Sequence, residues 1–205
     1  MEVLQEALID PLSNALYSYV LIYVLIGAGI WFTVRTRAVQ VRLFGLMFRL
    51  VGGSTGAAEG GISSFQAFCV GLASRVGTGN IAGVAIALTL GGPGAIFWMW
   101  CVALLGMATA FVEATLGQIF KVRADDGSYR GGPAYYIQRG LGSRRWGIVF
   151  AILLIFAFGF AFNMVQANTI SEALDNGHAV APGWTAVFLM ILAAPVLFGG
   201  VKRVA

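Results

Sequence analysis

The sequence predicts an all-α membrane protein with about five transmembrane helices. Hydrophobic residues make up 59% of the 205 residues and charged residues only 11%, well below the roughly 25% charge of an ordinary soluble domain. The charges lie in a few islands, and the apolar gaps between them can hold helices of about 20 residues, which cross about 30 Å of hydrocarbon. One apolar run carries an arginine and a glycine-rich polar cluster at its centre, a pattern typical of a helix broken within the membrane.

The apolar gaps define the predicted spans. The uncharged run from Val76 to Val112 would extend about 55 Å as one helix at about 1.5 Å per residue, so it is too long for a single crossing. The "GGPG" stretch at 91–94 therefore marks a turn between two spans. The five spans are expected at about 12–34, 62–90 (broken near 74–80), 95–120, 147–172 and 184–201.

The first connection, at about 36–60, is expected to be an amphipathic helix at the membrane surface followed by a glycine-rich link. Arg35, Arg42 and Arg49 recur every seven residues, and apolar residues fill another face. This spacing is typical of helices that lie in the interface of a bilayer.

Capping signals mark two further helix starts. Ser63 or Ser64 can cap the second span. The loop at 121–146 is expected to contain a short helix with Pro133 as its first residue and Gly140 at its end.

The basic residues predict the orientation. All lysines and arginines except Arg75 lie in three segments, 35–49, 121–145 and 202–203. The positive-inside rule makes these segments cytoplasmic and the amino terminus external, in a multi-pass protein of the plasma (cell inner) membrane. The last basic segment leads toward a further span, so the sequence is expected to be an incomplete protein.

The polar cluster "SRVGTGN" is the candidate site. A break here would free backbone carbonyls on one side and amides on the other. Carbonyls, with the Thr78 hydroxyl and the Asn80 side-chain oxygen, suit a small hard cation, and the free amides suit a carboxylate. The alternative is that Gly77 and Gly79 only let helices approach closely. A dinucleotide site is disfavoured, because this G-x-G-x-x-A pattern follows no strand.

Two further sets of polar residues lie within predicted spans. Arg75 needs a partner in the membrane, and Glu113 on the next span is the acid that can supply it, as a structural pair or as a gate. Asn163 and Gln166 share one face of the fourth span. They either face a substrate or hydrogen-bond between helices.

Several segments together resemble the alanine or glycine:cation symporter (sodium:alanine symporter) family. They are "GGPGAIFWMWCVALLG" at 91–106, "ASRVGTGNIAGVA", "EATLGQIFK" and "YRGGPAYYIQRGLG". The resemblance implies an inverted-repeat (5+5) amino acid transporter fold with a broken first repeat helix. This chain would hold an extra helix and the first four helices of repeat one. The implied activity is symport of a small neutral amino acid (alanine or glycine) with Na+ by alternating access, without another cofactor.

The break also resembles the Val-Gly-x-Gly-Asn break of the neurotransmitter:sodium symporters. By that resemblance the Asn80 oxygen would contribute to one sodium site, and the amides around Thr78 to Asn80 would hold the substrate carboxylate. The resulting sodium-site residues are Ala73, Val76, Thr78 and Asn80. The resulting substrate-site residues are Gly77, Thr78, Gly79, Asn80, Asn163 and Gln166.

Other functional classes are less well supported by the sequence. An enzyme is not expected, because there is no nucleophile–base pair, no transition-metal cluster and a single histidine. The excess of basic residues is explained by orientation in the lipid bilayer, so a nucleic-acid partner is not expected. Two alternatives remain open: a passive channel around the glycine break, and a non-transporting fragment.

Overall fold

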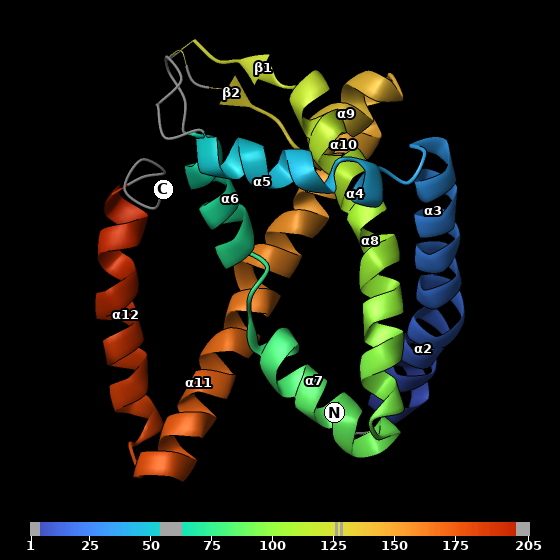
Figure 1. Ribbon diagram of the computed structural model, residues 1–205. Coiled ribbons are helices and arrows are strands. Elements are labelled where there is room, and N and C mark those ends of the chain that lie inside the picture. Colours follow the sequence, from blue (N-terminus) through green and yellow to red (C-terminus); the bar gives the residue numbers. More distant parts are fainter. Residues whose placement is uncertain (1–4, 54–62, 126, 128, 200–205) are drawn as a thin grey trace. The chain divides into compact units, whose positions relative to one another are not determined.

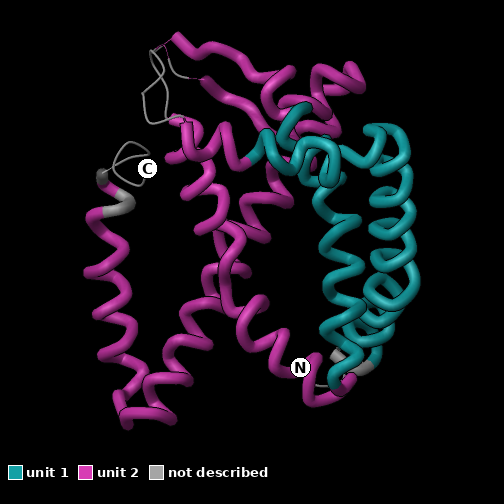
Figure 2. The backbone as a smooth tube through the Cα atoms, viewed as in Figure 1, with its two compact units in different colours: residues 1–47, 93–116 teal, residues 48–92, 117–205 magenta. Residues whose placement is uncertain are grey.

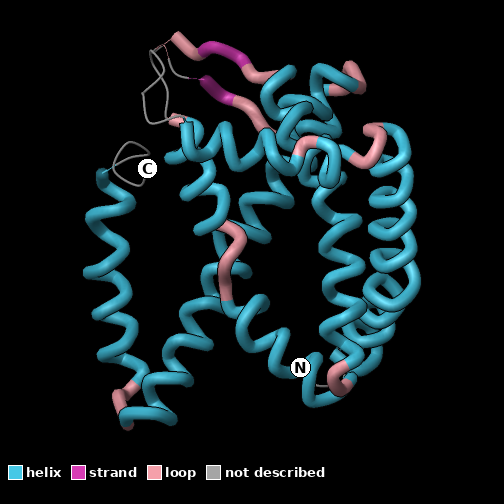
Figure 3. The backbone as a smooth tube through the Cα atoms, viewed as in Figure 1, coloured by secondary structure: helices cyan, strands magenta, loops and turns pink. Residues whose placement is uncertain are grey.

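The protein is almost entirely helical. The computed structural model describes residues 5–53, 63–125, 127 and 129–199, and its helices are joined by short loops (Figure 3). The predicted all-α class is confirmed in this coarse form. One pair of two-residue strands is an addition that the sequence did not predict.

The helices are described as an amino-terminal series that ends at Gly53 and a second series that begins at Ser64 (Figure 1). The first comprises η1 (Gln5–Ile9), α2 (Asp10–Ala15), η2 (Leu16–Leu21), α3 (Ile22–Arg35), α4 (Val39–Arg42) and α5 (Phe44–Gly53). The second comprises α6 (Ser64–Ala73), α7 (Thr78–Gly91), α8 (Gly94–Ile119), β1 (Val122–Arg123), β2 (Tyr129–Arg130), α9 (Pro133–Gly140), α10 (Arg144–Leu154), η3 (Ile155–Ala161), α11 (Phe162–His178) and α12 (Pro182–Gly199). The segments labelled η are π-helical.

The chain divides into two compact units (Figure 2). Unit 1 comprises Met1–Met47 and Pro93–Leu116, and unit 2 comprises Phe48–Gly92 and Gly117–Ala205. In unit 1, α3 lies beside α8. Gly29 is buried at their contact, where an added Cβ would lie 2.8 Å from the Leu105 Cβ. A small residue therefore sets this close helix approach, as in many membrane helix pairs.

The predicted interfacial helix is divided into several elements. Arg35 ends α3, Arg42 ends α4, and Arg49 lies in α5. Arg37 and Ala38 have φ values of 55° and 51°, and this left-handed conformation ends a right-handed helix. The arginine heptad thus does not lie on one helix, a correction to the prediction for 36–60. The glycine-rich link expected after α5 lies outside the described residues.

The start of α6 confirms the predicted serine cap. Ser63 Oγ accepts a hydrogen bond from Gln66 N at 3.2 Å, and Gln66 Oε1 accepts one from Ser63 N at 2.9 Å. This reciprocal pair is a capping box, which satisfies two amides that the helix itself cannot. The turn at 91–94 is also present, because α7 ends at Gly91, Gly92 has a φ of 65°, and α8 begins at Gly94.

The fourth predicted span is longer than expected. The predicted range 147–172 is contained in a continuous helix from Arg144 to His178 that includes η3. It ends where Ala179 adopts a left-handed conformation with φ of 53° and donates its N–H to Asp175 O at 2.9 Å. This αL cap, rather than the polar residues before it, terminates the helix.

The loop at 121–146 folds into a hairpin and a helix. β1 pairs antiparallel with β2, with Val122 opposite Arg130 and Arg123 opposite Tyr129. The predicted helix from Pro133 to Gly140 is confirmed as α9. α9 packs on α10, where a Cβ at Gly147 would lie 2.9 Å from the Ala134 carbonyl.

Several helices have the length and hydropathy of membrane-spanning helices. Three of those in the described part of the chain are long and apolar enough to cross a bilayer, at Ala7–Arg35, Gly94–Ile119 and Arg144–His178. The bent pair α6–α7 makes four if it is one span. α12, whose described apolar stretch is Pro182–Pro195, is not among these helices, so the count of five spans stays a prediction.

Candidate functional site

A break between two helices forms the centre of the candidate site. α6 ends at Ala73, and its last turn is closed by a bond from Val76 N to Leu72 O at 3.1 Å. Gly77 then has extended backbone, with φ of −159° and ψ of −173°, and α7 begins at Thr78. The two helices are bent by 51° at this point. The regular backbone hydrogen bonding of the apolar segment is therefore interrupted.

The break presents oxygen atoms that have no hydrogen-bond donor among the described residues. Within the described part of the chain, no hydrogen-bond donor reaches the carbonyl oxygen of Ala73 or of Val76. Asn80 donates its Nδ2 to Arg75 O at 3.0 Å, and no described donor reaches its Oδ1. All three oxygens belong to exposed residues. Backbone carbonyls and side-chain amide oxygens are ligands that hard cations prefer.

The break is joined to α11 by one long-range hydrogen bond. Thr78 N donates to Gln166 Oε1 at 3.0 Å, across 88 positions of sequence. A Cβ on Gly77 would overlap the Gln166 side-chain amide, whereas a Cβ on Gly79 would meet nothing within 4 Å. Gln166 is thus brought to the predicted site, and the two glycines differ in what surrounds them.

Asn163 is directed to its own helix. Its Nδ2 donates to Phe158 O at 2.9 Å and to Gly159 O at 3.2 Å, both in the π-helical segment η3. A π-helical turn changes the register of the residues that follow it, and such turns are frequent at functional sites. Residue patterns do not indicate this wide turn, so the sequence did not predict it.

Arg75 and Glu113 lie in different units of the structure. The Arg75 Nη1 donates to the Gly71 carbonyl at 3.0 Å, on the last turns of α6. Glu113 is an exposed residue of α8. Their pairing therefore stays a prediction.

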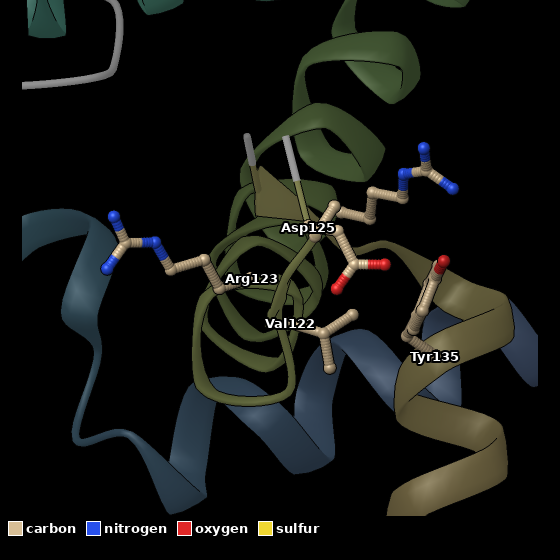
Figure 4. Close-up of a pocket in the computed structure, with 6 residues that line it drawn as sticks. Val122, Arg123, Asp125 and Tyr135 are labelled. Atoms are coloured by element: carbon tan, nitrogen blue, oxygen red, sulfur yellow. The ribbon is translucent and has the colours of Figure 1, made fainter. Parts of the chain in front are cut away.

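A shallow pocket lies outside the break, on the hairpin of unit 2. It is lined by Val122, Arg123, Ala124, Asp125, Arg130 and Tyr135. Figure 4 shows Arg123 directed away from Asp125 and Tyr135. The strand register places Arg123 and Arg130 on adjacent pairs, and side chains of adjacent pairs point to opposite faces. The two guanidinium groups do not converge, and the pocket makes no anion site.

The described residues contain no group of three or more histidine, cysteine, aspartate or glutamate side chains that could hold a metal ion. Cys69 and Cys101 are free thiols. The groups described at the break are backbone amides and carbonyls, the Thr78 side chain and the amide side chains of Asn80 and Gln166.

A helix break with free amides and carbonyls between apolar helices is characteristic of one class of membrane protein, the secondary transporters. Their discontinuous helices use these groups to bind ions and solutes. The comparison with protein families narrows the class: the chain belongs to the sodium:alanine symporter family, whose profile matches residues 1–205. The family is one of transporters and not of enzymes.

Several relatives show where the chain falls within the family. It is 53% identical over 204 residues to the amino-acid carrier protein AlsT of Bacillus subtilis, and 46% identical over 206 residues to the probable sodium/glutamine symporter GlnT of the same organism. It is 37% identical over 205 residues to the sodium/alanine symporter AgcS of Methanococcus maripaludis. The alignments cover 100%, 100% and 97% of this chain. The chain spans only 43%, 43% and 45% of the length of these relatives.

The contrast between the two glycines gives a direct test of the site geometry. Gly77→Ala is expected to destabilise the protein by about 0.5–1.5 kcal/mol, because the new methyl group displaces the end of the Gln166 side chain and breaks its hydrogen bond with Thr78 N. Gly79→Ala is the matched control and is expected to leave stability unchanged or slightly higher, because alanine is the better helix former. Thermal unfolding of the full-length protein in detergent measures both. Equal stability of the two variants would contradict the packing of Gln166 on Gly77.

Proposed function

We propose that this chain is the amino-terminal part of a sodium-coupled symporter for small neutral amino acids, alanine or glycine. The observation that carries the proposal is the helix break at the predicted polar cluster, with unpaired carbonyls on one side and amides on the other. Membership of the sodium:alanine symporter family supports the same conclusion.

Sodium is proposed to bind on the oxygen side of the break. Its ligands would be the carbonyls of Ala73 and Val76, the Thr78 hydroxyl and the Asn80 Oδ1. The absence of any described donor to the two carbonyls and to Asn80 Oδ1 supports this assignment. The Asn80 Nδ2 bond to Arg75 O fixes the amide so that its oxygen faces away from that bond.

The amino acid carboxylate is proposed to bind at the start of α7. The amides around Gly77, Thr78, Gly79 and Asn80 lie at the positive end of the helix dipole, which favours an anion. The Gly79 N–H has no acceptor among the described residues, and the Thr78 N–H reaches only Gln166. Gln166 and Asn163 are proposed as the residues of α11 that complete the substrate site.

The proposed mechanism is alternating access in the plasma membrane. The amino terminus would be external and the basic segments cytoplasmic, as the positive-inside rule requires. The five predicted spans would form an extra helix and four helices of the first repeat of a 5+5 fold. Sodium and amino acid would each bind one conformation more tightly and so shift the populations of outward-facing and inward-facing states. Arg75 and Glu113 would pair in one of these states.

The function is tested by uptake of labelled alanine into proteoliposomes that contain the full reading frame. Uptake is expected to be concentrative only with an inward sodium gradient, and Asn80→Ala is expected to lower the apparent sodium affinity by about tenfold or more, because a cation ligand is lost. Asn168→Ala is the matched control, since that amide bonds Glu172 on its own helix.

Two results would refute the proposal. Uptake that only equilibrates, does not saturate and ignores sodium would indicate a passive channel. Absence of uptake by the full-length protein, with binding of neither solute, would indicate a non-transporting protein.

The charge pair is tested by exchange of its members. Each single variant, Arg75→Glu or Glu113→Arg, leaves two like charges in the membrane, where one unpaired charge costs about 2.5–3.5 kcal/mol on insertion scales. The double variant restores the pair, so its folded yield and uptake are expected to exceed those of both single variants. A double variant as impaired as the single ones would show that the two residues do not pair.

A further inference from the structure

The amino terminus of α7 is capped by a different helix. α6 is capped within its own segment by Ser63 and Gln66. The N-cap of α7 is Gly77, which has no side chain and makes no side-chain cap bond. The acceptor for the first amide of α7 is supplied instead by Gln166 of α11, whose Oε1 lies 3.0 Å from Thr78 N.

The Gln166 side chain occupies the space that glycine leaves at the N-cap. The Gln166 amide lies directly against Gly77, where an added Cβ would overlap it. Serine, threonine, asparagine and aspartate are the usual N-cap residues because their oxygens bond the first free amides of the helix. In place of such a residue, this sequence has a glycine and a glutamine 89 residues later. The arrangement makes the cap removable, because α11 supplies it from outside the segment.

We propose that Gln166 is an internal substitute for the substrate carboxylate. It accepts the Thr78 N–H while the site holds no amino acid, and it withdraws when a carboxylate takes that amide. The inference rests on the proposed function and specifies how the same site is regulated. Gln166 remains a residue of the proposed substrate site, but its role is to occupy the Thr78 amide in the empty site and to give that amide up to the carboxylate.

The chemistry of the exchange makes it selective. An amide oxygen is a neutral, planar acceptor, whereas a carboxylate oxygen carries charge and forms hydrogen bonds roughly twice as strong. The positive end of the α7 dipole adds to the preference for the anion. Replacing Gln166 at Thr78 is therefore favourable for an amino acid and unfavourable for an analogue such as alaninamide, whose amide acceptor is no stronger than that of Gln166.

The test uses the full-length protein with threonine labelled by 15N, so that the Thr78 amide is observed directly. Gln166→Met keeps the length of the side chain and removes the acceptor. Hydrogen exchange at Thr78 in the absence of substrate is expected to accelerate in this variant by about fivefold or more, the effect of one net hydrogen bond. Asn168→Leu is the control, because it removes an amide of the same helix that bonds only Glu172, and it is expected to leave Thr78 exchange unchanged.

Alanine binding in saturating sodium gives the second readout. Gln166→Met is expected to tighten alanine binding by about fivefold, since the competitor is gone, and to tighten alaninamide binding by a similar factor, because the same Thr78 amide is then free for either acceptor. Weaker alanine binding in Gln166→Met with unchanged Thr78 exchange would overturn the proposal and make Gln166 an ordinary substrate ligand.

Failure of the proposed function gives a different experimental result from failure of the capping bond. If the wild-type protein binds no alanine while Thr78 exchange depends on Gln166, the capping bond is supported and the competition with substrate is refuted. If Gln166→Met does not fold, Gln166→Asn provides the same test, because its side chain is one methylene too short to reach Thr78.

Discussion

The constraint on which this structure depends is that a backbone leaving the helix among apolar residues must still satisfy its amides and carbonyls. In hydrocarbon each unsatisfied group costs several kcal/mol, so such a break persists only where protein, water or a ligand provides partners. In this protein three side chains provide hydrogen-bond partners for the backbone around the break. Asn80 donates to the carbonyl of Arg75, Arg75 donates back to Gly71, and Gln166 accepts from Thr78. Among the described residues, the groups without a partner include the Ala73 and Val76 carbonyls, the Asn80 Oδ1 and the Gly79 N–H, and these are the groups proposed to bind a cation and a carboxylate.

This distribution of paired and unpaired groups explains why the break contains these residue types. Glycine at 77 leaves room for Gln166. Asparagine at 80 can donate to the backbone with its nitrogen and keep its oxygen for a second partner. The π-helical segment η3 precedes Gln166, and Asn163 donates to two of its carbonyls, those of Phe158 and Gly159; a π-helical turn shifts the register of the residues that follow it. The proposed site and the helix that carries Gln166 therefore belong to one hydrogen-bonding arrangement in unit 2.

Local signals in the sequence predicted much of this structure, and long-range contacts were not predicted. The Ser63 cap and the helix from Pro133 to Gly140 depend on a few adjacent residues, and both were predicted correctly. The arginine heptad failed because spacing does not report the left-handed residues that divide it. The hairpin, the π-helical turn and the Gln166 bond to Thr78 depend on backbone geometry or on partners far along the chain. Sequence patterns identified both ends of that bond but not the bond itself.

We propose that a single helix break, between α6 and α7, binds sodium and the amino acid together. The most direct measurement is calorimetric binding to the full-length protein, of alanine with and without sodium and of sodium with and without alanine. Coupled sites require each solute to change the affinity of the other by the same factor, typically about 5- to 150-fold. That result is predicted. Alanine affinity that is independent of sodium would contradict the claim, because the two solutes would then not share the break.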